Sequence, residues 1–341
     1  MKAAVWIGKN QVEVKEVEDP KIKSDEVLVK VKSAGICSTD IHVIKGDFYN
    51  GNPPHILGHE IAGDIIEIGE KVDRWKNGDR VVVETMVNCG DCYYCRRGMK
   101  NLCDHGGDIG FPPYQGGYAE YIAVPARCLY RIPDNVTYDE AGILESFICP
   151  AGSIFRLGMH FGDTILIQGA GPAGLAYVQS VRACGAGKII VAARNEKRLR
   201  LAKKFGAHVV IDIQKENMES RIMEETDGHG VDISIDAAGF PSTVENSIKY
   251  VRKGGNVILY GIPDDRDYIN FPVTQIILKQ LSVHGASGNP HVWQPVLDLL
   301  SQGIFNLKDM VTHTFTLDQF NEAVDFVSKR KDGVIKAVVH P

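Results

Sequence analysis

The chain has 341 residues, of which 44% are hydrophobic and 24% are charged, and its formal net charge is −5 at pH 7. This length exceeds one ordinary hydrophobic core and predicts two domains. The acidic balance and the absence of a long apolar run argue against nucleic acid and membrane partners. The N-terminal stretch has no sustained apolar region of the signal-peptide type, so we expect a cytoplasmic protein.

Two textures follow one another along the chain. Residues 1–146 contain short β-type runs such as EVLVKVKSAGI and GDRVVVE, broken by glycine, proline and aspartate, which predict an all-β domain. Over residues 147–288, apolar strands such as TILIQ and KIIVAA alternate with helical segments, including one over Glu196–Phe205. That alternation predicts βαβ units and a parallel sheet. We expect residues 289–341 to return to the first domain, giving a fold class of α/β plus β.

Four cysteines lie in the short polar stretch NCGDCYYCRRGMKNLC, with the spacing C-x2-C-x2-C-x7-C. Four thiolates this close in sequence can converge on one tetrahedral Zn²⁺, which is the usual form of a structural zinc site. Disulfides would need an oxidising compartment that nothing else in the sequence indicates. A zinc ribbon that binds nucleic acid would need a basic stripe, which a chain of this charge lacks. We therefore predict a zinc lobe over about residues 86–105, held by Cys89, Cys92, Cys95 and Cys103.

A glycine-rich loop follows the apolar strand TILIQ and precedes the helical segment LAYVQSVRAC. A G-x-G-x-x-G pattern between a strand and a helix predicts a dinucleotide-binding loop whose backbone approaches the pyrophosphate. A plain glycine turn is the alternative, and the flanking segments disfavour it. The residues expected at the coenzyme are Gly169, Gly171, Pro172, Ala173 and Gly174.

The end of the next strand, in KIIVAARNEKRL, indicates which coenzyme is used. An NAD site places an acidic residue there to bind the ribose 2′-hydroxyl. This chain has Ala193 followed by Arg194, whose planar guanidinium can bind a 2′-phosphate, and Arg198 lies one helical turn further on. The alternative is that these arginines are solvated charges at the start of a helix. We expect NADP(H) in preference to NAD(H).

A second group of metal-type residues lies on both sides of the cysteine lobe. It consists of Cys37, the pair His59 and Glu60, and Glu145 near the change in texture. A thiolate, an imidazole and a carboxylate can form a zinc site with three protein ligands and one open position. The pattern therefore predicts a catalytic zinc in addition to the structural one.

Together these motifs make the sequence resemble the zinc-dependent medium-chain dehydrogenases, in particular their polyol branch. The resemblance extends over nearly the whole chain and rests on AGICSTDIH, GHEIAGDIIEIG, GDRV, the cysteine lobe, GGYAEY, Glu145 and GAGPAG. It implies a GroES-like all-β catalytic domain, a Rossmann coenzyme domain with a doubly wound parallel sheet, and a homotetramer or homodimer.

The resemblance also implies roles for single residues. Cys37 and His59 match catalytic zinc ligands, and Glu60 and Glu145 match the two glutamates that compete for the third position. Thr39 matches the hydroxyl that contacts the substrate oxygen, and His42 matches the next member of a proton relay.

We expect hydride transfer between a polyol or secondary alcohol and NADP(H), the substrate being a small alcohol or ketone. A threonine-type dehydrogenase is the nearest alternative. A non-catalytic, zinc-stabilised nucleotide binder is the alternative from another class.

Overall fold

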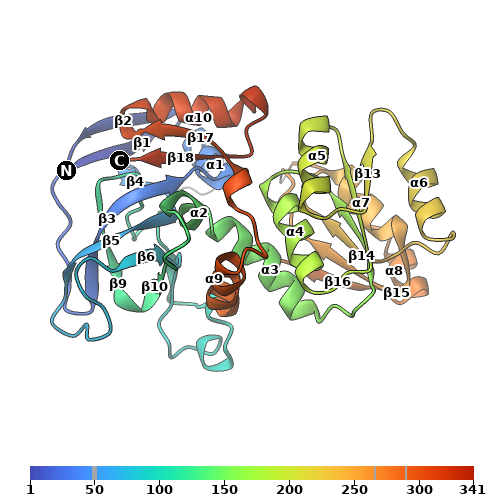
Figure 1. Cartoon of the computed structure of the whole chain (residues 1–341), viewed down its shortest axis with the longest axis horizontal. Coiled ribbons are helices and arrows are strands. Elements are labelled where there is room, and N and C mark those ends of the chain that lie inside the picture. The colour runs from blue at the N-terminus through green and yellow to red at the C-terminus, as the bar shows by residue number, and fades with distance from the viewer. Residues whose placement is uncertain (48–51, 265, 289) are drawn as a thin grey trace. The chain divides into compact units, whose positions relative to one another are not determined.

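The computed structural model describes residues 1–47, 52–264, 266–288 and 290–341 (Figure 1). The chain forms two compact units, the first made of Met1–Ser146 with Trp293–Pro341 and the second of Phe147–Val292. The C-terminal segment thus joins the unit that contains the N-terminus. Asn289, the first residue of the predicted returning segment, lies outside the described residues. Within the described ranges, no helix combines the length and apolar character that crossing a membrane demands.

The first unit is built mainly from β-strands. One sheet has the order β2-β1-β4, a larger one has the order β10-β6-β5-β3-β18-β17 with β9 also paired to β3, and β7 pairs with β8. The bounds of these strands are β1 Lys2–Gly8, β2 Gln11–Glu16, β3 Glu26–Gly35, β4 His55–Ile56, β5 Glu60–Ile68, β6 Arg80–Val83, β7 Met86–Val87, β8 Gly107–Asp108, β9 Tyr121–Pro125, β10 Leu129–Arg131, β17 Val311–Thr316 and β18 Lys336–His340.

Helices flank these strands and begin at residues suited to helix termini. Thr137, for example, accepts a hydrogen bond from the backbone of Glu140 and caps α2. The helices of this unit are α1 Ser38–Lys45, α2 Tyr138–Gly142, α9 Trp293–Ser301 and α10 Phe320–Ser328. Helix α3, Glu145–Leu157, runs across the residue at which the two units divide.

Strand β3 is the centre of the larger sheet, because it pairs with β5, β9 and β18. Three of its apolar residues, Val27, Val29 and Ala34, are fully buried. Strand β18 comes from the C-terminal segment and lies between β3 and β17, antiparallel to the first and parallel to the second. A segment remote in sequence therefore forms part of the same sheet, next to the end of β3.

The second unit contains a parallel sheet of order β13-β12-β11-β14-β15-β16. Its strands are β11 Thr164–Gln168, β12 Lys188–Ala193, β13 Val209–Asp212, β14 Val231–Asp236, β15 Val251–Leu259 and β16 Ser282–Gly285. The helices are α4 Pro172–Ala183, α5 Glu196–Phe205, α6 Met218–Glu225, α7 Pro241–Tyr250 and α8 Val273–Lys279. The predicted strand and helix alternation is confirmed, and α5 has the predicted bounds.

The order of this sheet reverses at β11. The chain proceeds outward from β11 to β13 on one side and from β14 to β16 on the other. Loops that leave β11 and β14 therefore diverge, and the carboxyl ends of the strands at such a reversal are the usual ligand position in sheets of this type. Gly169, the first residue after β11, lies at this position.

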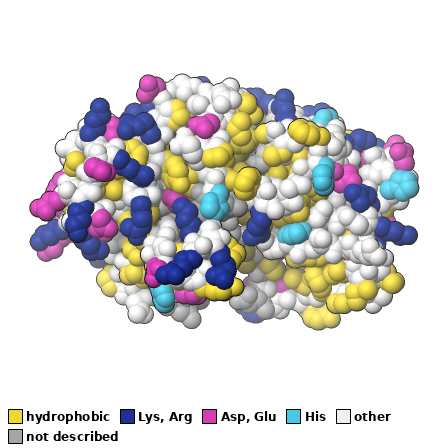
Figure 2. All heavy atoms as spheres, turned by 90° about the horizontal axis from the view of Figure 1, so that it is seen from below, with side chains coloured by type: hydrophobic (Ala, Val, Ile, Leu, Met, Phe, Trp, Pro, Cys, Tyr) yellow, Lys and Arg dark blue, Asp and Glu magenta, His cyan; other side chains and the backbone are white. Residues whose placement is uncertain are grey.

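Basic and acidic side chains are interspersed on the face of the molecule that Figure 2 shows, in keeping with the small net charge of −5.

Candidate functional site

Cys37, His59 and Glu60 come together in the first unit, with one ligand atom from each lying within 4.8 Å of the others. The strand register explains this. In the antiparallel ladder of β3 and β5, Gly35 pairs with Glu60. Cys37 follows the end of β3 and His59 precedes β5, so both lie at the same end of the ladder. A thiolate, an imidazole and a carboxylate at these distances fit the donor set of a zinc site.

Glu60 is fully buried and lies against Gly35. A Cβ atom at residue 35 would lie 2.0 Å from the Glu60 Oε2 atom, so only glycine leaves room for the carboxylate. The Oε1 atom accepts a hydrogen bond of 2.5 Å from the Nζ atom of Lys336. The Oε2 atom has no hydrogen-bond partner within the described part of the chain. One carboxylate oxygen is therefore fixed, and the other is left for a ligand.

Lys336 is a residue of the site that the sequence motifs did not identify. It is the first residue of β18, only 3% exposed, and also donates to the carbonyl oxygen of Ile36 at 3.1 Å. Burial disfavours its charged form, but the Glu60 carboxylate and then the Cys37 thiolate raise the pKa of Lys336 above its usual value. The available signal was a lone lysine inside the apolar run GVIKAVVH.

Asp40 connects two of the predicted ligands. Its Oδ2 atom accepts a hydrogen bond of 3.1 Å from the backbone of Cys37, the N-cap residue of α1. Its Oδ1 atom lies 3.3 Å from the Nδ1 atom of His59. Burial opposes ionisation, but His59, the hydroxyl of Tyr118 and the Cys37 amide together lower the pKa of Asp40 below its usual value. A carboxylate behind a ligating histidine orients the ring and fixes its tautomer.

Thr39 and His42 both lie on α1. The Oγ1 atom of Thr39 is 3.6 Å from the Cys37 Sγ atom, so the predicted substrate hydroxyl contact lies beside the mixed cluster. The side chain of His42 is 57% exposed, and its Nδ1 atom lies 3.8 Å from the Asp47 carboxylate. Residues three apart share a helix face. The structure therefore brings Thr39 to the metal-type residues and His42 to solvent one turn away.

Glu145, at the start of α3, approaches the same cluster. Its Oε2 atom lies 3.9 Å from the Nε2 atom of His59. Burial raises the pKa of Glu145 to about 7, although the charge of His59 opposes this rise. Glu145 is thus adjacent to the Cys37, His59 and Glu60 group, but it is not one of the three residues whose ligand atoms all lie within 4.8 Å.

The four lobe cysteines form a second cluster, with their sulfur atoms all within 4.8 Å of one another. The Cys89 and Cys95 sulfurs are 4.0 Å apart, those of Cys92 and Cys103 are 3.8 Å apart, and each of the four cysteines is free. Backbone N–H groups of Cys92 and Asp91 point at the Cys89 sulfur, at 3.3 and 3.5 Å. Four convergent sulfurs with amide donors fit a tetrathiolate metal site with no open position.

The cysteine lobe is attached to the sheet through a buried carboxylate. The Nζ atom of Lys100 lies 3.1 Å from the Oε1 atom of Glu84, which is 1% exposed, and the Tyr130 hydroxyl donates to Oε2 at 3.2 Å.

The glycine loop of the second unit has the geometry of a dinucleotide site. Gly169 has φ of +105°, which favours glycine, and a Cβ at residue 174 would lie 2.0 Å from the Gly169 carbonyl oxygen. Gly171 is the N-cap of α4 and Pro172 its first residue, followed by Ala173. The free N–H groups at this helix start can bind a phosphate group.

Ala193 ends β12, so no carboxylate lies at the strand end itself. Arg194 follows and is exposed, whereas Arg198 in α5 reaches the loop: its Nη1 atom lies 3.9 Å from the point where a Gly171 Cβ would be. The neighbouring strand β13 ends at Asp212, whose carboxylate forms an ion pair with Lys215 at 3.3 Å.

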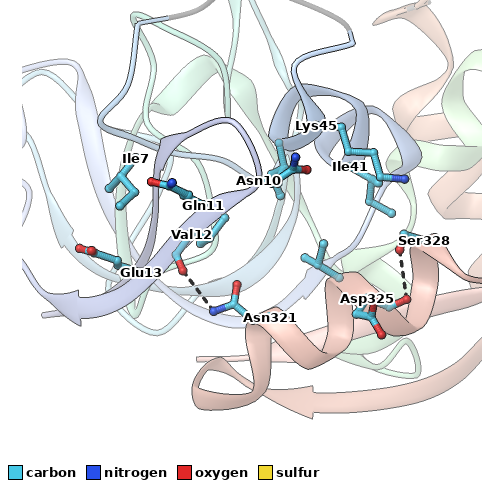
Figure 3. Close-up of a pocket in the computed structure, with 12 residues that line it drawn as sticks. Ile7, Asn10, Gln11, Val12, Glu13, Ile41, Lys45, Asn321, Asp325 and Ser328 are labelled. Carbon is cyan, nitrogen blue, oxygen red and sulfur yellow. Dashed lines mark hydrogen bonds between the residues drawn. The ribbon is translucent and has the colours of Figure 1, made fainter.

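A cavity of about 560 Å³ lies elsewhere in the first unit, between the β1–β2 hairpin, α1 and α10 (Figure 3). The Nδ2 atom of Asn321 donates to the carbonyl oxygen of Val12 across it, at 3.1 Å. Helix α1 contributes Ile41, Ile44 and Lys45 to its wall, whereas none of the residues that line it belongs to the predicted site.

Three features define the class of protein as a zinc- and nucleotide-dependent oxidoreductase. They are a metal-type cluster with a carboxylate oxygen that lacks a partner among the described residues, a closed thiolate cluster, and a dinucleotide loop. Two family models match the chain, "Alcohol dehydrogenase GroES-like domain" over residues 23–134 and "Zinc-binding dehydrogenase" over residues 172–302.

Individual proteins match nearly the whole chain. Sorbitol dehydrogenase of Bacillus subtilis (strain 168) is 34% identical over 344 residues, which cover 100% of this chain and 97% of that protein. L-threonine 3-dehydrogenase of Pyrococcus horikoshii is 35% identical over 330 residues, covering 95% and 94%. The solved structure of a zinc-binding dehydrogenase from Sinorhizobium meliloti 1021 bound to NADP has a TM-score of 0.93 at 31% identity, covering 100% and 99%.

The chain belongs to the zinc-dependent medium-chain alcohol dehydrogenases, in the branch that includes sorbitol and threonine dehydrogenases. The predicted fold class and the prediction of a zinc- and NAD(P)-dependent alcohol dehydrogenase are confirmed. The alternative of a non-catalytic nucleotide binder is wrong, because the relatives are dehydrogenases over their full length.

We expect Lys336→Met to lower the free energy of unfolding of the first unit by about 3 kcal/mol, because removing one partner leaves a buried charge uncompensated. All three tryptophans, Trp6, Trp75 and Trp293, belong to this unit, so their fluorescence during urea unfolding reports on it alone. Lys32→Met is the control, because Lys32 is 38% exposed at 3.6 Å from Asp64 and should contribute less than about 0.5 kcal/mol. Equal, small losses for the two variants would contradict the importance of the buried pair.

Proposed function

We propose that this enzyme interconverts a secondary hydroxyl and a ketone on a polyol or other small secondary alcohol, with NADP(H) as coenzyme. The observation that carries the proposal is the mixed group of Cys37, His59 and Glu60. Three protein ligands leave a position for the substrate oxygen, whereas four thiolates do not. The mixed group is the catalytic site in this proposal, and the lobe of Cys89, Cys92, Cys95 and Cys103 holds a second, structural zinc.

When bound, Zn²⁺ supplies a Lewis acid that lowers the pKa of the substrate hydroxyl, and the nicotinamide supplies the hydride acceptor. Thr39 accepts the hydroxyl proton, because a hydroxyl can accept and donate in the same step and its Oγ1 atom lies beside Cys37. His42, on the same face of α1 and open to solvent, carries the proton away. The reduction of a ketone uses the same residues in reverse order.

Glu60 is the third resting ligand in this proposal. Its Oε2 atom is buried and has no hydrogen-bond partner in the described ranges, whereas Lys336 fixes Oε1. A buried carboxylate oxygen in that position needs a partner, and a cation in the cluster provides one. Glu145, whose Oε2 atom lies 3.9 Å from the Nε2 atom of His59, is the other carboxylate that would hold the metal.

The arginines after β12 support NADP(H). Ala193 offers no carboxylate that would repel a 2′-phosphate. Arg198 reaches the glycine loop, and Arg194 follows the strand end at an exposed position. The Asp212 carboxylate on the next strand is balanced by Lys215.

The relatives indicate two candidate classes of substrate. A sorbitol dehydrogenase and a threonine dehydrogenase match at nearly equal identity, 34% and 35%. The polyol reading is our leading proposal, and oxidation of a β-hydroxy amino acid such as threonine is the second candidate.

We expect a screen of sugar alcohols, simple secondary alcohols and L-threonine, followed by absorbance at the reduced-coenzyme band, to give the highest kcat/KM with a polyol and NADP⁺.

Arg194→Ala should lower kcat/KM for NADP⁺ by about tenfold or more and leave kcat/KM for NAD⁺ within about twofold, because only NADP⁺ carries the 2′-phosphate. Lys197→Ala, at an exposed position in the first turn of α5, is the control. Preference for threonine, or for NAD⁺, would overturn the corresponding part of the proposal.

We expect Cys37→Ser to reduce the zinc content from two ions to one per chain and to lower kcat by about a thousandfold or more, since Lewis-acid catalysis contributes several kcal/mol. Metal analysis by mass spectrometry gives the stoichiometry. Cys184→Ser is the matched control, because Cys184 is exposed and belongs to neither cluster. Two zinc ions in Cys37→Ser would contradict the assignment.

A homo-oligomer is part of the proposal. Exposed large hydrophobic side chains lie on α8 and on the residues before it, in the segment between β15 and the outer strand β16 of the second unit's sheet. They form what we term the edge patch: Ile262, Tyr268, Phe271, Val273, Ile277 and Leu278, which are 42–85% exposed. An apolar patch beside an open strand edge is typical of an interface, and a two-fold axis would pair the edge and cover both copies of the patch.

We expect the wild-type chain of 37.5 kDa to sediment as a dimer or tetramer and the double variant Ile277→Glu with Leu278→Glu to shift to the monomer. Two buried carboxylates without partners would oppose association. Phe161→Glu, at a 90% exposed site outside the edge patch, should leave the mass unchanged. A monomeric wild type, or an unshifted double variant, would refute this interface.

A further inference from the structure

Tyr118 lies beneath the mixed cluster and has no part in the proton path described above. It is fully buried and precedes β9 in the sequence GGYAEY. Its hydroxyl lies 2.7 Å from the Oδ2 atom of Asp40 and 3.0 Å from the carbonyl oxygen of Gly35. Both neighbours flank Cys37, one on each side in the sequence.

The Asp40 carboxylate contacts two of the proposed ligands as well as Tyr118. The Oδ2 atom that accepts from Tyr118 also accepts from the Cys37 backbone, at 3.1 Å. The Oδ1 atom faces the His59 ring nitrogen at 3.3 Å. A small rotation of this carboxylate would therefore move the Cys37 turn and the His59 ring together.

The Tyr118 ring is itself held in place. A Cβ atom at Gly58, the residue before His59, would lie 2.9 Å from the ring, so the ring packs directly on that backbone. On α10, the Phe320 ring lies with its centroid 4.6 Å from that of Tyr118. The hydroxyl therefore contacts Asp40 from a fixed position. A Tyr118→Phe substitution removes only this hydroxyl and keeps the ring.

We propose that Tyr118 is a positioning residue, whose hydroxyl locks the Asp40 carboxylate in the orientation that holds Cys37 and His59 in metal-binding geometry. This inference rests on the proposed function in taking Cys37, His59 and Glu60 as a zinc site. Groups behind metal ligands set ligand orientation, and their removal weakens metal binding by about 10- to 100-fold. Tyr118 acts one bond further out, so its effect lies at the lower end of that range.

The test follows the rate at which the purified, zinc-loaded enzyme releases zinc to a colorimetric chelator. The phase missing from Cys37→Ser identifies the mixed site, and the remaining phase is the lobe. We expect Tyr118→Phe to release the mixed-site zinc about tenfold faster and to leave the lobe phase unchanged. Asp40→Asn, which keeps the shape but weakens the acceptor, should accelerate the same phase further.

Tyr138→Phe is the matched control, because the Tyr138 hydroxyl also bonds to a carboxylate, that of Asp64, away from both clusters. It should lower stability as Tyr118→Phe does and leave both release phases within about twofold. Mixed-site release at the wild-type rate in Tyr118→Phe, or in Asp40→Asn, would overturn the inference. That outcome differs from failure of the proposed function, in which Cys37→Ser itself would retain both zinc ions and both phases.

Discussion

The buried ion pair between Glu60 and Lys336 is the interaction on which the arrangement of the site depends. It joins the start of β5 to the last strand of the chain at a position where both side chains are at most 3% exposed. A carboxylate and an ammonium at such burial persist only when each compensates the other and the remaining polar atoms have partners. Lys336 meets this condition through Glu60 and the Ile36 carbonyl. Glu60 keeps one oxygen free of protein partners within the described residues, which is what a metal ligand requires.

Around this pair, the register of strands β3 and β5 determines where the proposed metal ligands lie. Gly35 opposite Glu60 permits the carboxylate to lie against the backbone, and the same register brings Cys37 and His59 to one end of the ladder. Asp40 contacts both, since it accepts a hydrogen bond from the Cys37 amide and lies 3.3 Å from the Nδ1 atom of His59. The carboxylates of Asp40 and Glu60 and the thiolate of Cys37 would repel one another if no cation lay near them. Lys336 supplies one positive charge, and a divalent metal would supply the rest.

Much of the fold and part of the site could be predicted from the sequence. The cysteine spacing, the glycine loop between a strand and a helix, and the alternating strands and helices are local patterns, and each predicted its element because its cause is local. The grouping of Cys37 with His59 and Glu60 was predicted from their residue types, and the resemblance to a family gave them their roles, since no local rule joins them. Lys336, Asp40 and Tyr118 were missed for the same reason. Their importance comes from contacts between segments far apart in the chain, 276 residues in the case of Glu60 and Lys336. The placement of Glu145 beside, rather than within, the three-residue group is likewise a tertiary outcome.

In the proposed enzyme, the chain holds two zinc ions of different kinds, one closed by thiolates and one open at Cys37, His59 and Glu60. Anomalous X-ray diffraction from crystals of the enzyme, recorded on both sides of the zinc absorption edge, tests it most directly. We expect two anomalous peaks per chain, one among Cys89, Cys92, Cys95 and Cys103 and one within bonding distance of the Cys37 sulfur and a His59 nitrogen. A single peak at the lobe, with the mixed cluster empty in zinc-replete crystals, would contradict it.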